Sequence, residues 1–191
     1  MAQRATFTKE MIVDAAFGLA REHGWAAVTA RTIARQLGSS TMPLYSTLKS
    51  MEEIEKEVRA RAEKLMHDYQ RRPYADNPMV SSAVGYVTFA RDERNLFRFL
   101  FIDRPVTMNR PEGSAADVEA VQGVVDLVDQ AATALQDPRI LKSWAFTHGL
   151  ASLISSMVID LPDDRITSLL MEAGGAFYGV EEKKNKEETD E

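Results

Sequence analysis

Apolar residues recur every three or four positions along most of this 191-residue chain, which is the spacing that places them on one face of an α-helix. The clearest run comprises Ile12, Ala15, Ala16, Leu19 and Ala20. The strict alternation of apolar and polar residues that marks strands is missing from the sequence. Glycines fall near the ends of the periodic segments, where helices commonly stop. The pattern therefore predicts an all-α fold.

The first 50 residues predict three short helices. Thr8, Thr29 and Ser40 stand where these helices would begin, and a hydroxyl at such a position can accept a hydrogen bond from a free backbone N–H. Gly24 and Gly38 stand where the first two helices would end, because glycine adopts the backbone of helix stops and tight turns at little cost. Helices joined by a tight turn at Gly38 are the arrangement of a helix-turn-helix, whose second helix enters the major groove of DNA.

A fourth helix is predicted to begin after Ser50 and to run to about Arg72, just before Pro73. Its many charges favour a solvated helix that joins a head to a body. Further helices are expected at residues 78–92, 94–103, 115–136, 138–160 and 162–180. The predicted organisation is a helix-turn-helix head (1–50), a connecting helix (51–77), a helical body for ligand binding and dimerisation (78–180) and a polar, disordered tail (181–191).

Composition excludes several classes of protein. Hydrophobic residues make up 45% and charged residues 27% of the chain, which is the balance of a globular protein. There is no cysteine, so disulfide scaffolds, thiolate metal sites and cysteine nucleophiles are excluded. The apolar core of a signal peptide does not follow the first residues, and no apolar run reaches the roughly 20 residues that a membrane span needs. We therefore expect a cytoplasmic protein without a cofactor, a bound metal or a membrane partner.

The charge is unevenly distributed. Residues 1–50 hold six Lys/Arg and three acids, giving +3, whereas residues 51–191 hold 17 Lys/Arg and 26 acids, giving −9. A basic head on an acidic body indicates that only the head meets a polyanion.

The head also resembles a known family. Residues Thr29–Glu53 (TARTIARQLGSSTMPLYSTLKSMEE) are similar to the DNA-binding segment of the TetR (tetracycline-repressor) regulators of bacteria. The resemblance implies a homodimer on a double-stranded, pseudo-palindromic DNA operator. It implies phosphate contacts by Thr29, Arg31, Tyr45 and Lys49, and base contacts by Ser40, Thr41, Met42 and Ser46. The chain departs from the usual family pattern at Ser46, Thr47 and Met51, which bears on DNA affinity more than on the fold.

The body resembles one subgroup of this family. The segment from Trp144 to Leu153 contains His148 followed by Gly149 and is similar to a Trp-His-Gly signature. In such proteins aromatic and flexible apolar residues line a cavity for a small-molecule inducer, and here they are Phe97, Phe99, Phe101, Met108 and Trp144. The expected ligand contacts are Phe97, Phe101, Trp144 and His148, with plain core packing as the alternative for each.

The helix expected at 138–160 is apolar on two faces, one with Trp144 and His148 and one with Phe146 and Leu153. A helix of this kind must be buried on both sides. We therefore expect residues 138–180 to form a homodimer interface, with a monomeric core as the alternative.

Two other functions stay open at this stage. In the first, the head has lost DNA binding, which leaves a dimeric ligand-binding or interaction protein. A small helical enzyme is the remaining class, but the histidines His23, His67 and His148 are far apart in the sequence. The sequence has no His-Glu-x-x-His, phosphate-binding loop or nucleophile elbow, so the prediction is a regulator, not an enzyme.

Overall fold

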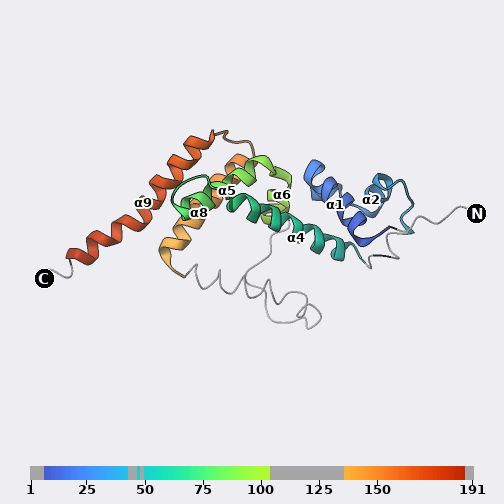
Figure 1. Cartoon of the computed structure of the whole chain (residues 1–191), viewed down its shortest axis with the longest axis horizontal. Coiled ribbons are helices and arrows are strands. Elements are labelled where there is room, and N and C mark those ends of the chain that lie inside the picture. Colours follow the sequence, from blue (N-terminus) through green and yellow to red (C-terminus); the bar gives the residue numbers. More distant parts are fainter. Residues whose placement is uncertain (1–6, 43–46, 48–49, 104–135, 188–191) are drawn as a thin grey trace, which may run out of the picture.

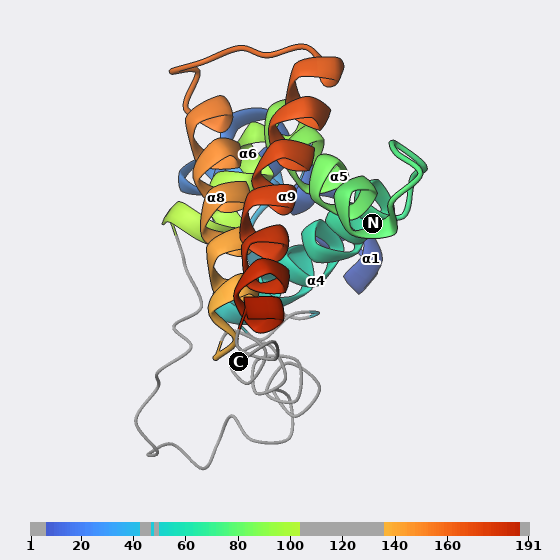
Figure 2. The same cartoon turned by 90° about the vertical axis from the view of Figure 1, so that its left-hand side faces the viewer.

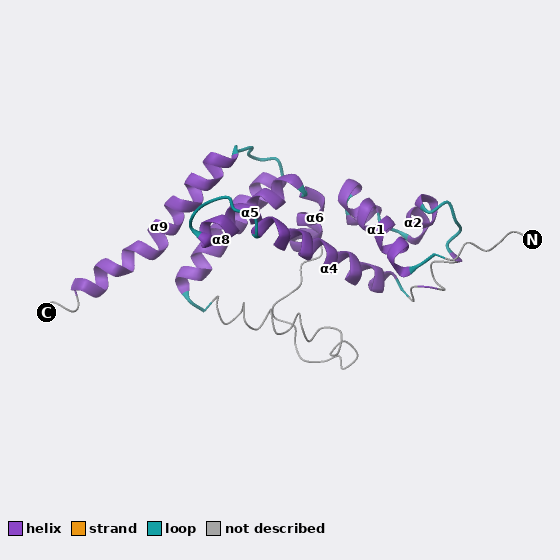
Figure 3. Ribbon diagram, viewed as in Figure 1, coloured by secondary structure: helices purple, strands orange, loops and turns teal. Residues whose placement is uncertain are grey.

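The computed structural model describes residues 7–42, 47, 50–103 and 136–187, with side chains up to residue 178. Within these ranges every regular element is a helix and no strand occurs, so the all-α prediction is confirmed (Figure 3). Most of the predicted helix that begins after Ser40, most of the predicted helix at 115–136, and Met108 lie outside the described residues. The elements are α1 (Lys9–His23), the 3₁₀ turn η1 (Trp25–Ala27), α2 (Ala30–Gln36), α4 (Met51–Gln70), α5 (Pro78–Asp92), α6 (Arg94–Arg98), the π-helical turn η2 (Phe99–Asp103), α8 (Pro138–Ser155) and α9 (Asp163–Glu187).

The helix starts and the turn of the head follow the sequence closely. The Thr8 hydroxyl accepts a hydrogen bond from the Met11 N–H at 3.2 Å and begins α1, and Thr29 caps α2 in the same way. Gly38 has a φ of 64°, the left-handed conformation predicted for the turn. Helices α1 and α2 contact each other, and each contributes a fully buried isoleucine, Ile12 and Ile33, to the common core.

Helix α4 runs from the head into the body (Figure 1). The expectation of a solvated connector is wrong for one of its faces, because five of its residues are buried. They recur every three or four positions and pack within the common core, where α4 meets α1 and α5. Charged residues between them lower the average hydropathy and hide the stripe. The buried residues are Ile54, Val58, Ala62, Met66 and Tyr69.

Helices α4 and α5 approach each other very closely at Gly85. A Cβ atom at this position would lie 2.5 Å from the backbone oxygen of Tyr69, which is closer than real Cβ contacts. The contact requires glycine on steric grounds. It fixes the end of α4 against the middle of α5.

Helices α8 and α9 lie side by side at the end of the molecule opposite the head (Figures 1 and 2). Helix α8 ends at Ser155 and not at residue 160 as predicted. Met157 has a φ of 59°, its N–H bonds to the Ile154 carbonyl, and the Val158 N–H bonds to the Leu153 carbonyl. These two bonds form a Schellman stop, which is unusual because its left-handed residue is not glycine.

Helix α9 continues to Glu187, so residues 181–187 of the expected polar tail extend this helix. This segment is rich in Glu and Lys and contains neither glycine nor proline. Such residues lose little side-chain freedom in a helix and extend it readily.

Candidate functional site

The residues expected to contact DNA divide into two groups in the structure. All those that are described are exposed at the surface of the head, and they are Thr29, Arg31, Ser40, Thr41 and Met42. The others, Tyr45, Ser46 and Lys49, lie outside the described residues.

The N-terminus of α2 is held by a reciprocal pair of hydrogen bonds that was not expected from the sequence. The Thr29 hydroxyl accepts from the Thr32 N–H at 3.1 Å, and the Thr32 hydroxyl lies 2.9 Å from the Thr29 nitrogen. The Thr32 hydroxyl also reaches the Ala27 carbonyl at 2.7 Å. The usual sequence signal of a capping box is Glu or Gln three residues after the cap, and here Thr32 takes that place. The start of α2 is therefore fixed in position.

The positively charged side chains of the head differ in whether they already have an acidic partner within the chain. Lys9 bonds to two carboxylates of α4, and Arg21 bonds to Glu93 of the body. Arg31 and Arg35 are exposed on α2, and neither has an acidic partner in the part of the chain that is described. Arg35 was not assigned a role from the sequence, although it lies one helical turn after Arg31. These two arginines are therefore available to an external anion.

The four expected ligand contacts come together in the body. With Tyr86 they form an aromatic cluster of residues from α5, α6, η2 and α8. The His148 ring stacks on Trp144 at a centroid distance of 5.0 Å and 7°. It lies 5.7 Å from Phe97 and 5.6 Å from Phe101. Phe97 is fully buried, whereas Trp144 is 43% exposed, so the cluster extends from the core to the surface.

One hydrogen bond connects the polar groups of this cluster. The Tyr86 oxygen lies 2.9 Å from Nδ1 of His148. Burial raises the pKa of the Tyr86 phenol, so this group keeps its proton and can donate to a neutral imidazole. Burial also lowers the pKa of His148, which favours that neutral form.

The next residues along the chain connect this cluster with the head. Phe99 lies between Phe97 and Phe101 in sequence, and its ring stacks on Trp25 at 4.6 Å. Arg59 of α4 lies over the Phe99 ring at 4.9 Å and donates to the Leu100 carbonyl at 3.2 Å. The turn η2 therefore contacts the aromatic cluster, the head and α4 at once.

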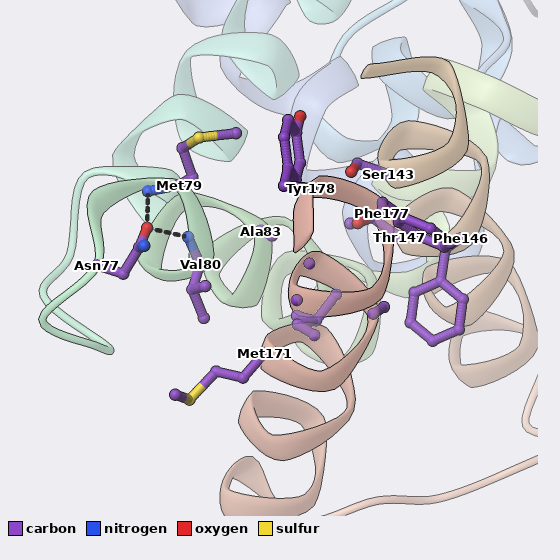
Figure 4. Close-up of a pocket in the computed structure, with 14 residues that line it drawn as sticks. Asn77, Met79, Val80, Ala83, Ser143, Phe146, Thr147, Met171, Phe177 and Tyr178 are labelled. Atoms are coloured by element: carbon purple, nitrogen blue, oxygen red, sulfur yellow. Dashed lines mark hydrogen bonds between the residues drawn. The ribbon is translucent and has the colours of Figure 1, made fainter. Parts of the chain in front are cut away.

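A separate pocket of about 380 Å³, the body pocket, lies between α5, α8 and α9 (Figure 4). None of the four expected ligand contacts lines it. It was missed because its walls come from three segments that are distant in the sequence. Its lining residues are Asn77, Met79, Val80, Ala83, Ser143, Phe146, Thr147, Leu170, Met171, Ala173, Gly174, Gly175, Phe177 and Tyr178.

Neither a metal site nor a membrane span is found among the described residues. They contain no group of three or more His, Asp or Glu side chains arranged to hold a metal ion. No helix within the described ranges has the length and apolar character needed to cross a membrane.

Comparison with protein families gives the decisive observation. A model described as "Tetracyclin repressor-like, C-terminal domain" matches residues 79–176. The chain belongs to the tetracyclin repressor-like (TetR) family. The matched region of this TetR protein runs from the start of α5 into α9 and includes the aromatic cluster and most of the lining of the body pocket, except Asn77, Phe177 and Tyr178. The matched region is a TetR-family regulatory domain. A search of curated proteins finds no match to the chain.

Proposed function

We propose that this TetR-family protein is a DNA-binding transcriptional repressor that acts as a homodimer on a pseudo-palindromic operator and is released by a small apolar ligand. We also propose that its body belongs to the Trp-His-Gly subgroup, on the sequence from Trp144 to Gly149. In this proposal residues 1–50 bind DNA, residues 51–77 connect the head to the body, and residues 78–180 bind the ligand and form the dimer.

The observation that carries the DNA-binding role is the exposed surface of α2. Lys9 and Arg21 already form ion pairs within the chain, whereas Arg31 and Arg35 have no acidic partner among the described residues. Arginines without an internal partner can bind the phosphates of DNA. Such contacts position a protein on DNA without reading its sequence. Base reading then falls to the exposed Ser40, Thr41 and Met42 and to the residues that follow them.

The apolar surface of α8 and the turn after it supports the homodimer. Leu153, Met157 and Val158 are exposed by 45%, 72% and 67%. Contiguous exposed apolar side chains of this size commonly mark an interface between proteins. In a two-fold dimer the two heads would face half-sites about 34–36 Å apart, one turn of DNA.

Selection of bound duplexes from a random DNA pool tests the proposal. The expected product is an inverted repeat whose half-sites are centred about 10 base pairs apart. A pool that shows no enriched sequence would instead favour the alternative, a dimeric ligand-binding protein without DNA binding.

A further inference from the structure

The body pocket has the size of a small-molecule site. Its volume of about 380 Å³ falls within the range of roughly 300–1,000 Å³ that is usual for ligand pockets. Met79 and Val80 of α5 form one wall, Ser143 and Thr147 of α8 a second, and Met171 of α9 part of a third (Figure 4). Three helices therefore converge on one concave space.

The polarity of the lining restricts the ligand. No lining residue carries a charge, and the large side chains are Phe146, Phe177, Met79, Met171 and Tyr178. A charged ligand would lose its hydration there without gaining a partner of opposite charge. The oxygen of Asn77 already accepts hydrogen bonds from the Met79 and Val80 N–H groups, as Figure 4 shows. The pocket therefore suits an uncharged and largely apolar molecule.

The Ser143 hydroxyl is a buried polar group of the pocket lining that lacks a partner within the described chain. Its oxygen is buried and makes no hydrogen bond within the described chain. In the same helix Ser152 donates to the carbonyl four residues earlier, at 2.8 Å, which is the common solution for a helical serine. Ser143 does not do so, although it lines the pocket beside Thr147 (Figure 4). A ligand with one hydroxyl or carbonyl group would supply the missing partner.

The opposite wall has room for that ligand. Gly174 lines the pocket, and a methyl group added at its Cα would meet no atom within 4 Å. An alanine there would therefore fill part of the pocket without a clash. Gly18 of α1 lies in the head, outside the proposed region for ligand binding and dimerisation. A Cβ atom there would make only an ordinary contact, 3.6 Å from the Gln36 side chain, so it provides a matched control.

We propose that the body pocket binds an uncharged aromatic molecule with one hydroxyl or carbonyl group, which hydrogen-bonds to Ser143. The proposal deepens the ligand part of the proposed function and rests on it. Ser143 and Thr147 line the pocket, and the residues that directly follow them, Trp144 and His148, belong to the aromatic cluster. A ligand in the pocket thus acts on the same helix that supports the cluster.

Direct binding of three related probes to the full chain tests the chemistry of the pocket. The probes are 2-naphthol, naphthalene and 2-naphthoate, which share a ring system and differ in the polar group. We expect saturable binding of 2-naphthol, about fivefold weaker binding of naphthalene because one hydrogen bond is lost, and no measurable binding of 2-naphthoate. In Ser143→Ala the advantage of 2-naphthol over naphthalene should disappear. Equal binding of all three probes, or no binding of 2-naphthol, would overturn the proposal.

Three variants locate the bound probe. Gly174→Ala should weaken 2-naphthol binding at least severalfold, whereas Gly18→Ala should leave it unchanged. Loss of binding in Trp144→Ala but not in Gly174→Ala would place the probe in the aromatic cluster and overturn the assignment. DNA affinity is measured separately with and without 2-naphthol. If the probe binds as expected and DNA affinity stays the same, the site stands and only ligand-controlled release is contradicted.

Discussion

Arg21 of α1 and Glu93, the residue between α5 and α6, join the head to the body through a two-pronged ion pair. The Arg21 Nε lies 2.7 Å from one Glu93 oxygen, and a second guanidinium nitrogen bonds to the other oxygen. Glu93 is only 5% exposed, whereas the Arg21 side chain is largely in solvent. The neighbouring Asn95 donates to the carbonyls of Arg21 and Glu22 at 3.0 Å each. The end of α1 is thus attached to the start of α6.

The unequal burial of this pair gives a prediction about stability. Arg21→Met leaves a carboxylate buried without its partner and should lower the free energy of unfolding by about 2–3 kcal/mol. Glu93→Gln leaves an arginine that water can reach, so its cost should be about 1 kcal/mol. Urea denaturation of both variants measures the difference. Equal losses, or a larger loss in Glu93→Gln, would show that the pair is not buried as described.

A second prediction concerns the close contact of α4 and α5. Gly85→Ala should destabilise the protein by about 1–3 kcal/mol, because the new methyl group meets the Tyr69 backbone and the helices must separate. Gly18→Ala, inside α1 where the new methyl group makes only an ordinary contact at 3.6 Å, should stabilise by up to about 1 kcal/mol. Thermal denaturation of the two variants should therefore move the midpoint in opposite directions. A stabilising Gly85→Ala would contradict the contact.

The dimer interface is tested by a charge on α8. Leu153→Glu should give monomers, because its exposed side chain lies within the proposed interface. Met42→Glu places the same charge on an exposed apolar residue of the head and should leave the dimer intact. Sedimentation velocity at micromolar concentration separates the two species. An unmodified chain that sediments as a monomer would refute the homodimer.

The buried imidazole predicts a dependence of stability on pH. The pKa of His148 is lowered from its usual 6.5, so between the two values the unfolded chain binds more protons than the folded one. This contribution to stability is complete above pH 6.5 and is lost as the pH falls through the folded pKa. His148→Gln should flatten the fall in melting temperature below pH 6.5. A pH profile identical to that of the wild type would exclude His148 as the cause.

Local features of the fold could be predicted because their causes are local. Caps at Thr8 and Thr29 and the turn at Gly38 each depend on a few neighbouring residues. The stop of α8 was missed because Met157 adopts a conformation that its residue type does not favour. The buried stripe of α4 was missed because intervening charges mask it.

Long-range relationships could not be predicted in the same way. Arg21 and Glu93 are 72 residues apart, and nothing in the sequence near either residue indicates the other. The aromatic cluster was anticipated as a set of residue types, but its assembly depends on how the helices pack, which brings Phe97 and Phe101 to within 5.7 and 5.6 Å of His148. The body pocket depends on how three helices pack, which periodicity does not determine.

Fluorescence anisotropy with a duplex recovered from the random pool tests the central claim, that the head binds operator DNA through α2, most directly. Wild type should bind the selected duplex far more tightly than a scrambled one. Arg31→Gln should weaken binding to both duplexes and lower the slope of log affinity against log salt by about one, whereas Lys9→Gln, which removes a cation already paired within the chain, should leave that slope unchanged. Equal affinity of wild type for the selected and scrambled duplexes, or a salt slope unaffected by Arg31→Gln, would contradict the account.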